Sequence, residues 1–273
     1  DEAVYGMDDA KMQVMQMVGQ WISNPDAVGT AIAIKGPMGT GKTTLVKEGI
    51  SKILNRPFEF IALGGATDSS FLEGHSYTYE GSVWGKIVDI VMKSKCMNPV
   101  IYFDELDKIS SSPKGEEITG ILTHLTDTTQ NTNFHDKYYS NVHFNLSKAL
   151  FIFSYNDESK VNSILKDRMY KIHTKGYKTT EKCTIAKNYL IPKIEKNVNF
   201  KTGDIIIPDE TIKYIIDNHT NKEQGVRNLK RAIEIIYTKI NLHRLMKEDS
   251  NLFNKEKTLK ITFPYTVTNE SVN

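Results

Sequence analysis

The sequence has few of the features that mark secreted, membrane-spanning or metal-rich proteins. Its 273 residues include only two cysteines, Cys96 and Cys183, which form neither a C-x-x-C pair nor a metal-spaced group with histidine. This pattern suggests no zinc site and indicates free thiols in a reducing compartment. No apolar run is long enough to span a bilayer, and the acidic first residues lack the apolar stretch of a secretion signal. We therefore expect a soluble cytoplasmic protein, or one of another reducing intracellular compartment, without membrane contact.

An excess of charge of one sign is also missing. Lysine and arginine total 35 residues against 33 aspartates and glutamates, which gives a formal net charge of +2. This balance disfavours nucleic acid as a partner, although it leaves a local basic patch open. The length exceeds one average domain and predicts a large domain with a smaller one. Because the chain starts at Asp1 and not at methionine, we expect a segment of a longer protein.

A glycine-rich stretch carries most of the functional information. It follows the apolar residues 31–34, precedes a helix-like segment over 45–54, and consists of Gly36, Pro37, Met38, Gly39, Thr40, Gly41, Lys42, Thr43 and Thr44. Consecutive backbone N–H groups of such a P-loop wrap a triphosphate, and the following helix N-terminus adds partial positive charge. In this pattern Lys42 reaches the β- and γ-phosphates and Thr43 places its hydroxyl on Mg²⁺. The loop therefore predicts a nucleoside triphosphate and Mg²⁺ as ligands.

Short apolar runs alternate with helical patterns around this loop. We expect a helix over residues 8–23 and strands at 30–35, 58–63, 100–103, 149–154 and 169–173, with helices between them. This alternation predicts an α/β fold whose five-stranded parallel sheet has helices on both faces. Between residues 127 and 145 we expect a short helix and a small β-hairpin, with Tyr138-Tyr139 in one strand and residues 142–144 in the other.

From Gly176 onward the pattern is helical only. Helices are expected over residues 179–189, from Asp209 onward, and over 226–243. We therefore predict three parts: an α/β nucleotide-binding domain over 1–175, a small all-α domain over 176–250, and a tail over 251–273. The tail contains a possible strand at 259–263 and would lead toward a further domain.

Polar residues follow two of the predicted strands. Asp104 and Glu105 end the third strand, and Asn156 follows the fourth. Because the carboxyl ends of parallel strands line the ligand crevice, these side chains should converge on the P-loop. We predict that Asp104 holds Mg²⁺ through its water shell and that Glu105 polarises the attacking water. Asn156 would hydrogen-bond the γ-phosphate or the water, or it simply ends its strand.

Two arginines are placed where they could stabilise charge on the transferring phosphoryl group. Arg168 precedes the fifth strand, where it could reach a neighbouring subunit's site, and Arg227 opens a helix of the small domain. An arginine supplied in trans can raise the rate by about 10³ to 10⁵. If Arg168 acts in this way, activity requires a ring or another oligomer. The alternative for both arginines is a surface salt bridge.

Further short motifs, taken in order, give the chain a family resemblance from Val4 to about Arg231. They are Leu63-Gly64-Gly65 with Asp68, Gly74-His75 with Thr78-Tyr79 and Gly81, Asn98-Pro99-Val100, Asp104-Glu105 with Asp107-Lys108, Phe134 with Asp136 and Tyr138, Leu146-Ser147-Lys148, Asp167-Arg168-Met169, Gly176-Tyr177-Lys178, and Gly225-Val226-Arg227-Asn228-Leu229. With these motifs and the P-loop, the sequence resembles the AAA+ module of Lon-type ATP-dependent proteases.

The resemblance implies an AAA+ P-loop NTPase domain followed by a helical lid, with ATP and Mg²⁺ as cofactors. The module would be the motor of a Lon-like ATP-dependent serine protease. In such a protease a homo-oligomer, a hexameric ring in the full protein, grips protein substrates, unfolds them and threads them to a peptidase chamber. The resemblance makes Arg168 the arginine finger, Asn156 the first sensor and Arg227 the second sensor.

The resemblance also implies contacts with substrate and adenine. It puts Tyr79 on a substrate-gripping pore loop, residues 109–117 on a second one, and Tyr5 and Gly6 beside the adenine. An aromatic ring suits a pore loop because it can insert between substrate side chains of any sequence. Glu80 departs from the family, which usually has an aliphatic residue after the pore tyrosine, and this change bears on grip strength or substrate preference.

Nothing in this chain matches the Ser-Lys peptidase domain of the family. We therefore expect the segment to hydrolyse ATP without cleaving peptides, and as an isolated segment it could be monomeric. Two alternatives stay open at this point. One is an ATPase-only protein remodeller or chaperone, and the other is a nucleic-acid-directed P-loop machine such as a clamp loader or helicase.

Overall fold

A computed structural model describes residues 4–24, 31–245 and 262–272 of the chain. By their internal contacts the residues fall into two compact units. The first consists of residues 1–37 and 41–175, and the second of residues 38–40 and 176–273. Each unit has its own apolar interior. In the first unit, apolar side chains pack on both faces of a sheet, and in the second they pack between helices.

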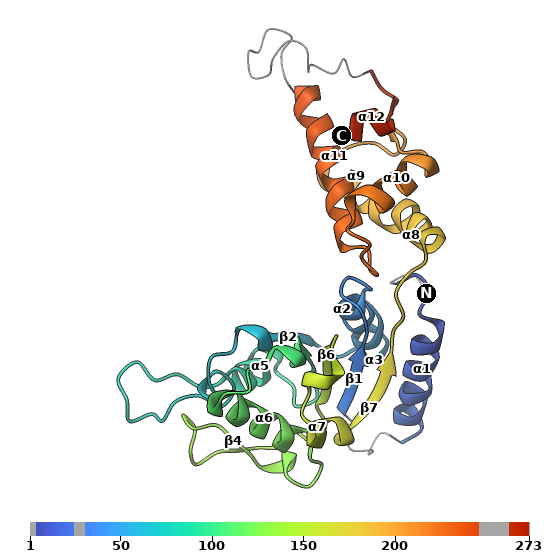
Figure 1. The fold of residues 1–273 in the computed structure, drawn as a ribbon. Helices are drawn as coiled ribbons and strands as arrows, with labels where there is room; N and C mark the ends of the chain where they lie inside the picture. The colour runs from blue at the N-terminus through green and yellow to red at the C-terminus, as the bar shows by residue number, and fades with distance from the viewer. Residues whose placement is uncertain (1–3, 25–30, 246–261, 273) are drawn as a thin grey trace. The chain divides into compact units, whose positions relative to one another are not determined.

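The first unit is organised around five parallel strands (Figure 1). Their order across the sheet is β2-β3-β6-β1-β7, and every neighbouring pair is parallel, as predicted. The strands are β1 (Ala31–Lys35), β2 (Phe58–Ala62), β3 (Val100–Asp104), β6 (Leu150–Tyr155) and β7 (Met169–His173). The central three strands are almost wholly buried because helices cover both faces of the sheet.

Alternate side chains of each strand enter two separate cores. One core lies under α1 (Asp8–Ser23) and the helical run that follows the P-loop, formed by α2 (Lys42–Thr44), the π-helical η1 (Leu45–Ile50) and α3 (Ser51–Leu54). The other lies under α5 (Lys86–Ser94), α6 (Pro113–Thr126) and α7 (Ser163–Arg168) (Figure 1). On β3, Tyr102 belongs to the first core and Phe103 to the second, as the two-residue period of a strand requires.

Short elements connect these helices and strands. They are η2 (Leu63–Gly65), α4 (Ser70–Glu73), η3 (Leu106–Lys108), η4 (Asn131–Asn133) and η5 (Glu158–Lys160). Three of them, η2, η3 and η5, follow the strands β2, β3 and β6 within a few residues, at the carboxyl end of the sheet where the P-loop also begins.

The hairpin expected between residues 127 and 145 exists, but one of its strands was assigned wrongly. Its strands are β4 (Phe134–His135) and β5 (His143–Phe144), which pair antiparallel. Tyr138 and Tyr139 lie in the turn, because the buried carboxylate of Asp136 accepts their backbone N–H groups at 2.9 and 3.3 Å. A side chain that takes up these N–H groups leaves none for a strand partner.

The second unit consists mainly of helices around an isoleucine-rich core. They are α8 (Thr179–Ile185), the π-helical η6 (Ala186–Leu190), α9 (Ile191–Val198), α10 (Asp209–His219), α11 (Arg227–Leu245) and α12 (Asn269–Val272). The unit also contains a two-residue parallel ladder between β8 (Ile205–Ile206) and β9 (Tyr265–Thr266). The prediction of a mainly helical domain is confirmed, but this short ladder was not expected. The strand expected at 259–263 begins outside the described residues, and the described strand nearby starts at Tyr265.

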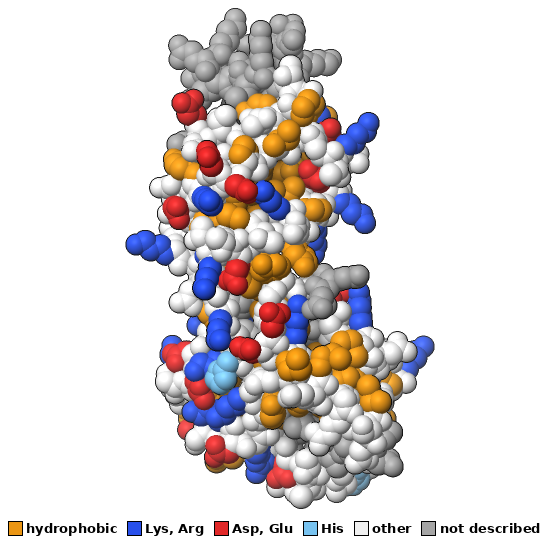
Figure 2. Space-filling model, turned by 90° about the vertical axis from the view of Figure 1, so that its right-hand side faces the viewer, with side chains coloured by type: hydrophobic (Ala, Val, Ile, Leu, Met, Phe, Trp, Pro, Cys, Tyr) orange, Lys and Arg blue, Asp and Glu red, His pale blue; other side chains and the backbone are white. Residues whose placement is uncertain are grey.

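The surface carries some large apolar side chains. Figure 2 shows hydrophobic side chains on the face that includes α1, where Met12, Met15 and Ile22 are exposed. In the described part of the chain, no helix combines the length and apolar character needed to cross a membrane.

Candidate functional site

The P-loop brings Lys42 and Asn156 together. The Lys42 ammonium donates to the carbonyl oxygens of Gly36 and Pro37, at 2.6 and 2.9 Å, and to Asn156 Oδ1 at 2.8 Å. Gly41 adopts a left-handed conformation (φ 97°) that a side chain would strain, and the helix starts directly after it. The largely buried ammonium is thus surrounded by oxygen atoms, as a group that binds phosphate oxygens should be.

The first glycine of the loop is fixed by close packing. The Gly36 N–H donates to the Tyr155 carbonyl at 3.2 Å, and a Cβ atom on Gly36 would lie only 1.9 Å from Thr174 Oγ1. Thr174 itself is held to the Lys35 carbonyl by its backbone N–H at 2.8 Å. Only glycine therefore fits where the chain leaves β1 and passes between β6 and β7.

Thr43 and Asp104 lie on either side of the Tyr102 hydroxyl. Thr43 Oγ1 donates to that hydroxyl at 3.3 Å, and the hydroxyl donates to Asp104 Oδ1 at 3.5 Å, where Ser154 Oγ also donates. Burial raises the pKa of Tyr102 to about 12, so this hydroxyl stays protonated and neutral. A hydroxyl and a carboxylate are hard oxygen ligands, and these residues fit Mg²⁺.

Other protein ligands are few around this pair. Among the described residues no group of three or more histidines, cysteines, aspartates or glutamates could hold a metal ion. A magnesium ion between nucleotide and protein commonly keeps several waters and binds one or two carboxylates together with phosphate oxygens. Thr43 and Asp104 would supply the protein's part of such a site.

Glu105 directly follows β3 in a left-handed backbone conformation (φ 60°, ψ 46°). Non-glycine residues seldom adopt this conformation, and they do so mostly where function or packing demands it. Its carboxylate lies against the backbone of Gly64, because a Cβ atom on Gly64 would be 2.5 Å from Glu105 Oε2. The glycine of η2 therefore makes room for the predicted catalytic carboxylate, a role that the sequence alone did not indicate.

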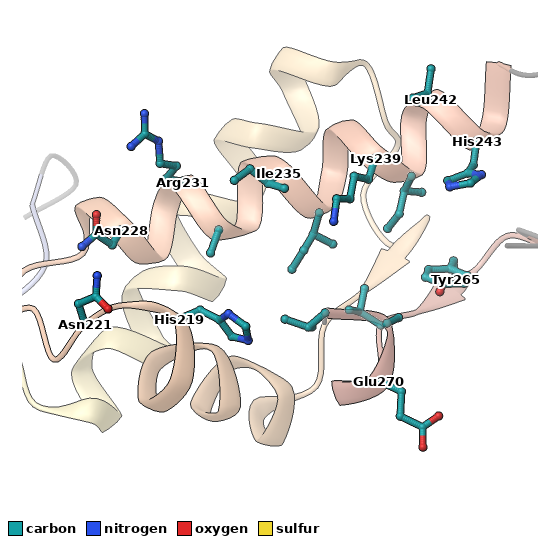
Figure 3. A pocket seen from close by; sticks show the side chains of 16 residues that line it. His219, Asn221, Asn228, Arg231, Ile235, Lys239, Leu242, His243, Tyr265 and Glu270 are labelled. Atoms are coloured by element: carbon teal, nitrogen blue, oxygen red, sulfur yellow. The ribbon is translucent and has the colours of Figure 1, made fainter. Parts of the chain in front are cut away.

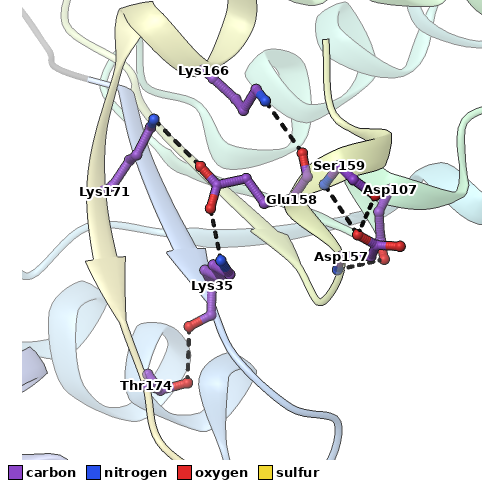
Figure 4. Close-up of polar contacts among 8 residues, drawn as sticks. All are labelled: Lys35, Asp107, Asp157, Glu158, Ser159, Lys166, Lys171 and Thr174. Atoms are coloured by element: carbon purple, nitrogen blue, oxygen red, sulfur yellow. Dashed lines mark hydrogen bonds and ion pairs between the residues drawn. The ribbon is translucent and has the colours of Figure 1, made fainter. Parts of the chain in front are cut away.

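Hydrogen bonds and ion pairs hold the segment after Asn156 in place (Figure 4). The Asp157 N–H donates to the buried carboxylate of Asp107 at 3.1 Å, and Glu158 pairs with Lys35 at 2.7 Å and with Lys171 at 3.5 Å. The hydrogen bond from Lys35 holds the pKa of Glu158 below its ordinary value. Through these contacts β1, β7 and η3 together fix the turn that carries Asn156.

Arg168 lies away from the P-loop of its own chain. Its guanidinium donates to the Thr123 carbonyl at 2.8 Å and pairs with Asp127 at 3.1 Å. In the register of β1 with β7, the residue after Arg168 pairs with Ala31, whereas the P-loop follows Lys35. The five residues of β7, roughly 16 Å of strand, therefore separate Arg168 from the end of the sheet where the P-loop begins.

Arg227 begins α11 and is exposed. The second unit also includes the tip of the P-loop, residues 38–40, where the Gly39 carbonyl accepts the Val226 N–H at 3.1 Å. The Thr40 carbonyl accepts the Tyr177 hydroxyl at 2.7 Å. Within this unit, Arg227 thus lies beside the loop tip.

Tyr5 and Gly6 belong to a turn that precedes α1. Gly6 and Met7 have positive φ angles of 64° and 58°. A Cβ atom on Gly41 would lie 3.5 Å from Val4 Cγ1 and 4.0 Å from Met7 Cε, so this turn runs beside the P-loop. The predicted position of Tyr5 and Gly6 near a bound nucleotide is compatible with this arrangement.

Tyr79 and Glu80 lie on an exposed loop between α4 and α5. Tyr79 is 70% exposed, and Tyr77, which the sequence analysis did not single out, is 62% exposed. A tyrosine ring offers a large apolar contact area together with a polar hydroxyl, so exposed tyrosines on one loop are suited to contact a partner. The loop therefore offers two tyrosines with an acidic residue next to one of them.

The base of this loop is rigidly held. The His75 N–H donates to the Val83 carbonyl at 3.0 Å, and the Gly85 N–H donates to the buried Asp136 carboxylate at 2.8 Å. Trp84 stacks on Tyr139, with ring centroids 6.2 Å apart. The hairpin β4–β5 thus supports the exposed loop, a role of Asp136 that no pattern in the sequence indicated.

A separate cavity of about 900 Å³ lies in the second unit (Figure 3). One side is formed by α11, with Arg231, Ile235 and Lys239, and the other by the C-terminal segment with Tyr265 and Glu270. None of the residues predicted to bind nucleotide is among the described residues that line this cavity.

Comparison with known proteins agrees with this geometry. Residues 32–177 match the model of the ATPase family associated with various cellular activities (AAA), and residues 196–253 match that of the Lon protease AAA+ ATPase lid domain. The chain is 42% identical over 245 residues to a Lon protease homolog of Acanthamoeba polyphaga mimivirus, an alignment that covers 89% of this chain and 24% of that relative.

Two cellular relatives are nearly as similar. Identity is 40% over 240 residues to the Lon protease of Clostridioides difficile, covering 88% of this chain and 30% of the relative. It is 36% over 258 residues to the mitochondrial Lon protease homolog of Schizosaccharomyces pombe, covering 94% and 24%. The chain thus spans less than a third of the length of these relatives.

These matches confirm the predicted fold, a P-loop NTPase domain followed by a lid domain. The first match covers more than half of the chain. The chain therefore belongs to the ATPase family associated with various cellular activities, as an ATP-hydrolysing AAA+ module of the Lon type.

Proposed function

We propose that this module binds ATP with Mg²⁺ at the P-loop and hydrolyses it with residues from the ends of β3 and β6. The observation that carries the proposal is the contact of Lys42 with Asn156 at 2.8 Å, which joins the P-loop to the strand end predicted to sense the γ-phosphate. A bound triphosphate would take over oxygen positions around the Lys42 ammonium. Thr43 and Asp104 would hold Mg²⁺, which supplies charge neutralisation of the phosphates.

Glu105 would act as the group that polarises the attacking water. The packing against Gly64 and the left-handed backbone hold its carboxylate in one place, next to the strand end that carries Asp104. Fixed placement matters because hydrolysis depends on the alignment of water, γ-phosphate and charge. Asn156 would orient the same water or the γ-phosphate.

Arg168 would act on the site of a neighbouring subunit. Its place just before β7, roughly 16 Å of strand from the P-loop end, does not suit action on the nucleotide of its own chain. In a ring, each subunit would supply this arginine to the next, and hydrolysis would depend on assembly. Arg227, beside the loop tip in the second unit, would sense the nucleotide within its own chain.

The full protein would use this hydrolysis to unfold and translocate protein substrates. Support comes from the exposed Tyr77 and Tyr79 on a loop with a rigid base, and from relatives that are named proteases. Tyrosine rings can contact polypeptide of any sequence, as a translocating motor requires. The two cysteines are free in the structure, which suits the reducing cytoplasmic location that we expect.

The test is the ATPase rate per chain as a function of protein concentration. For the unaltered chain we expect the rate to rise with concentration, because Arg168 from a second subunit completes each site. Arg168→Ala should lose this rise while still binding nucleotide, and Glu105→Gln should bind nucleotide without hydrolysing it. A rate that is independent of concentration and unaffected by Arg168→Ala would contradict the trans role of Arg168.

A further inference from the structure

The side chain of Tyr102 combines a buried ring with a hydroxyl at the predicted metal site. Tyr102 lies two residues before Asp104 on β3, so both side chains point to the same face of the sheet, toward the helix that follows the P-loop. The ring is fully buried, stacks on Phe60 of β2 with centroids 5.9 Å apart, and lies tilted against Phe58 at 6.0 Å. This packing fixes where the hydroxyl lies.

The hydroxyl forms the middle of a hydrogen-bonded chain. Thr43 donates to Tyr102, and Tyr102 donates to Oδ1 of Asp104, which also accepts from Ser154. The two contacts of Tyr102, at 3.3 and 3.5 Å, are longer than an ordinary O–H···O bond of about 2.8 Å. These hydrogen bonds therefore orient Thr43 and Asp104 while leaving both side chains able to adjust to a further partner.

The direction of these bonds suits cation binding. Because Thr43 uses its only proton toward Tyr102, both lone pairs of its oxygen stay available to a cation. Because Tyr102 and Ser154 both donate to Oδ1 of Asp104, the second carboxylate oxygen stays available to the cation or its water shell. A phenylalanine at position 102 would keep the ring packing and lose this arrangement.

We propose that the hydroxyl of Tyr102, helped by that of Ser154, positions Thr43 and Asp104 for Mg²⁺. The inference rests on the proposed roles of Thr43 and Asp104 as the protein's Mg²⁺ ligands. Tyr102 does not touch the cation, so it is a positioning residue. Its loss should weaken binding of the divalent cation without changing the affinity for nucleotide in the absence of metal.

Tyr102→Phe removes this one hydroxyl, and Tyr155→Phe is a matched control. Tyr155 is also a fully buried tyrosine at the end of a neighbouring strand, but its hydroxyl has no hydrogen-bond partner among the residues that the structure describes. Binding of Mn²⁺, in place of Mg²⁺, is titrated by electron paramagnetic resonance in the presence of a non-hydrolysable ATP analogue. Affinity for the same analogue in EDTA is measured by calorimetry, and thermal melting checks that each variant is folded.

For Tyr102→Phe we expect the half-saturating Mn²⁺ concentration to rise about tenfold, the lower end of the range for residues that orient metal ligands. Tyr155→Phe should match the unaltered chain, and analogue affinity in EDTA should be the same for all three proteins. Unchanged Mn²⁺ binding by folded Tyr102→Phe, or an equal loss of analogue affinity in EDTA, would overturn the proposal.

Two further outcomes also decide the proposal. If Tyr102→Phe does not fold, Ser154→Ala decides, because it removes the other hydroxyl that holds Asp104 Oδ1; a similar rise supports the proposal and unchanged Mn²⁺ binding overturns it. If the unaltered chain binds the analogue but no Mn²⁺, the proposed Mg²⁺ site is itself wrong, and the inference about Tyr102 is overturned with it.

Discussion

Replacing Gly64 by alanine tests how closely Glu105 must be held. The added methyl group would lie 2.5 Å from Glu105 Oε2 and 3.4 Å from Lys108 Cβ. Because ordinary van der Waals contact begins near 3.4 Å, the carboxylate has to retreat by about 1 Å. The backbone of Gly64 has no positive φ angle, so alanine should fit it without strain. The substitution therefore displaces the predicted catalytic carboxylate and little else.

A displacement of about 1 Å can lower a catalytic rate by roughly 100-fold. We expect Gly64→Ala to lower kcat by about 10- to 100-fold while ATP binding stays unchanged, as measured by steady-state ATPase assays and nucleotide titration. Gly65→Ala is the control, because no atom of the described part of the chain lies within 4 Å of a Cβ atom at Gly65. A kcat of Gly64→Ala close to that of the unaltered chain, or an equal loss in Gly65→Ala, would refute the role assigned to this contact.

Two other predictions follow from buried or paired carboxylates. Asp136→Ala removes the acceptor of the buried Gly85 N–H and of the partly buried N–H groups of Tyr138 and Tyr139. Because a buried N–H left unpaired costs roughly 1–3 kcal/mol, urea unfolding should show a clear loss of stability, and an unchanged unfolding midpoint would contradict this role of Asp136. Glu158 has a lowered pKa because Lys35 donates to it, so its stabilising contribution is complete above its ordinary pKa of 4.5 and is lost as the pH falls through the lower folded value. The melting temperature of Glu158→Gln should therefore lie below that of the unaltered chain at pH 7 and approach it at acidic pH, and a constant difference would contradict this assignment.

The strands and the P-loop could be predicted because their signals are local. Each apolar run of β1, β3 and β6 has the length of a buried strand and ends at a residue that cannot continue it, as at Gly36 and Asn156. Parallel topology then follows from the intervening helices, and with it the convergence of the strand ends. The contact between Lys42 and Asn156, 114 residues apart, is a consequence of this order of elements.

The missed features depend on contacts between distant segments. Tyr138-Tyr139 has the composition of a strand, but the buried Asp136 takes its N–H groups and turns the chain. Glycine is common at the end of a strand, so Gly64 drew no special interpretation. Only the position of the Glu105 carboxylate shows why a side chain at residue 64 would clash. The alternation that places Tyr102 on the same face as Asp104 was available from the sequence, and that signal could have identified its hydroxyl.

The most direct test of the account is to mix two inactive variants at the concentration where the unaltered chain is most active. Arg168→Ala retains an intact nucleotide site and lacks the arginine, whereas Glu105→Gln retains the arginine and lacks the carboxylate. If Arg168 acts across a subunit boundary, mixed assemblies contain sites with both groups, and the mixture should hydrolyse ATP faster than the sum of its two components. A mixture no faster than that sum, with both variants shown to assemble, would contradict the trans-acting arginine and with it the ring motor.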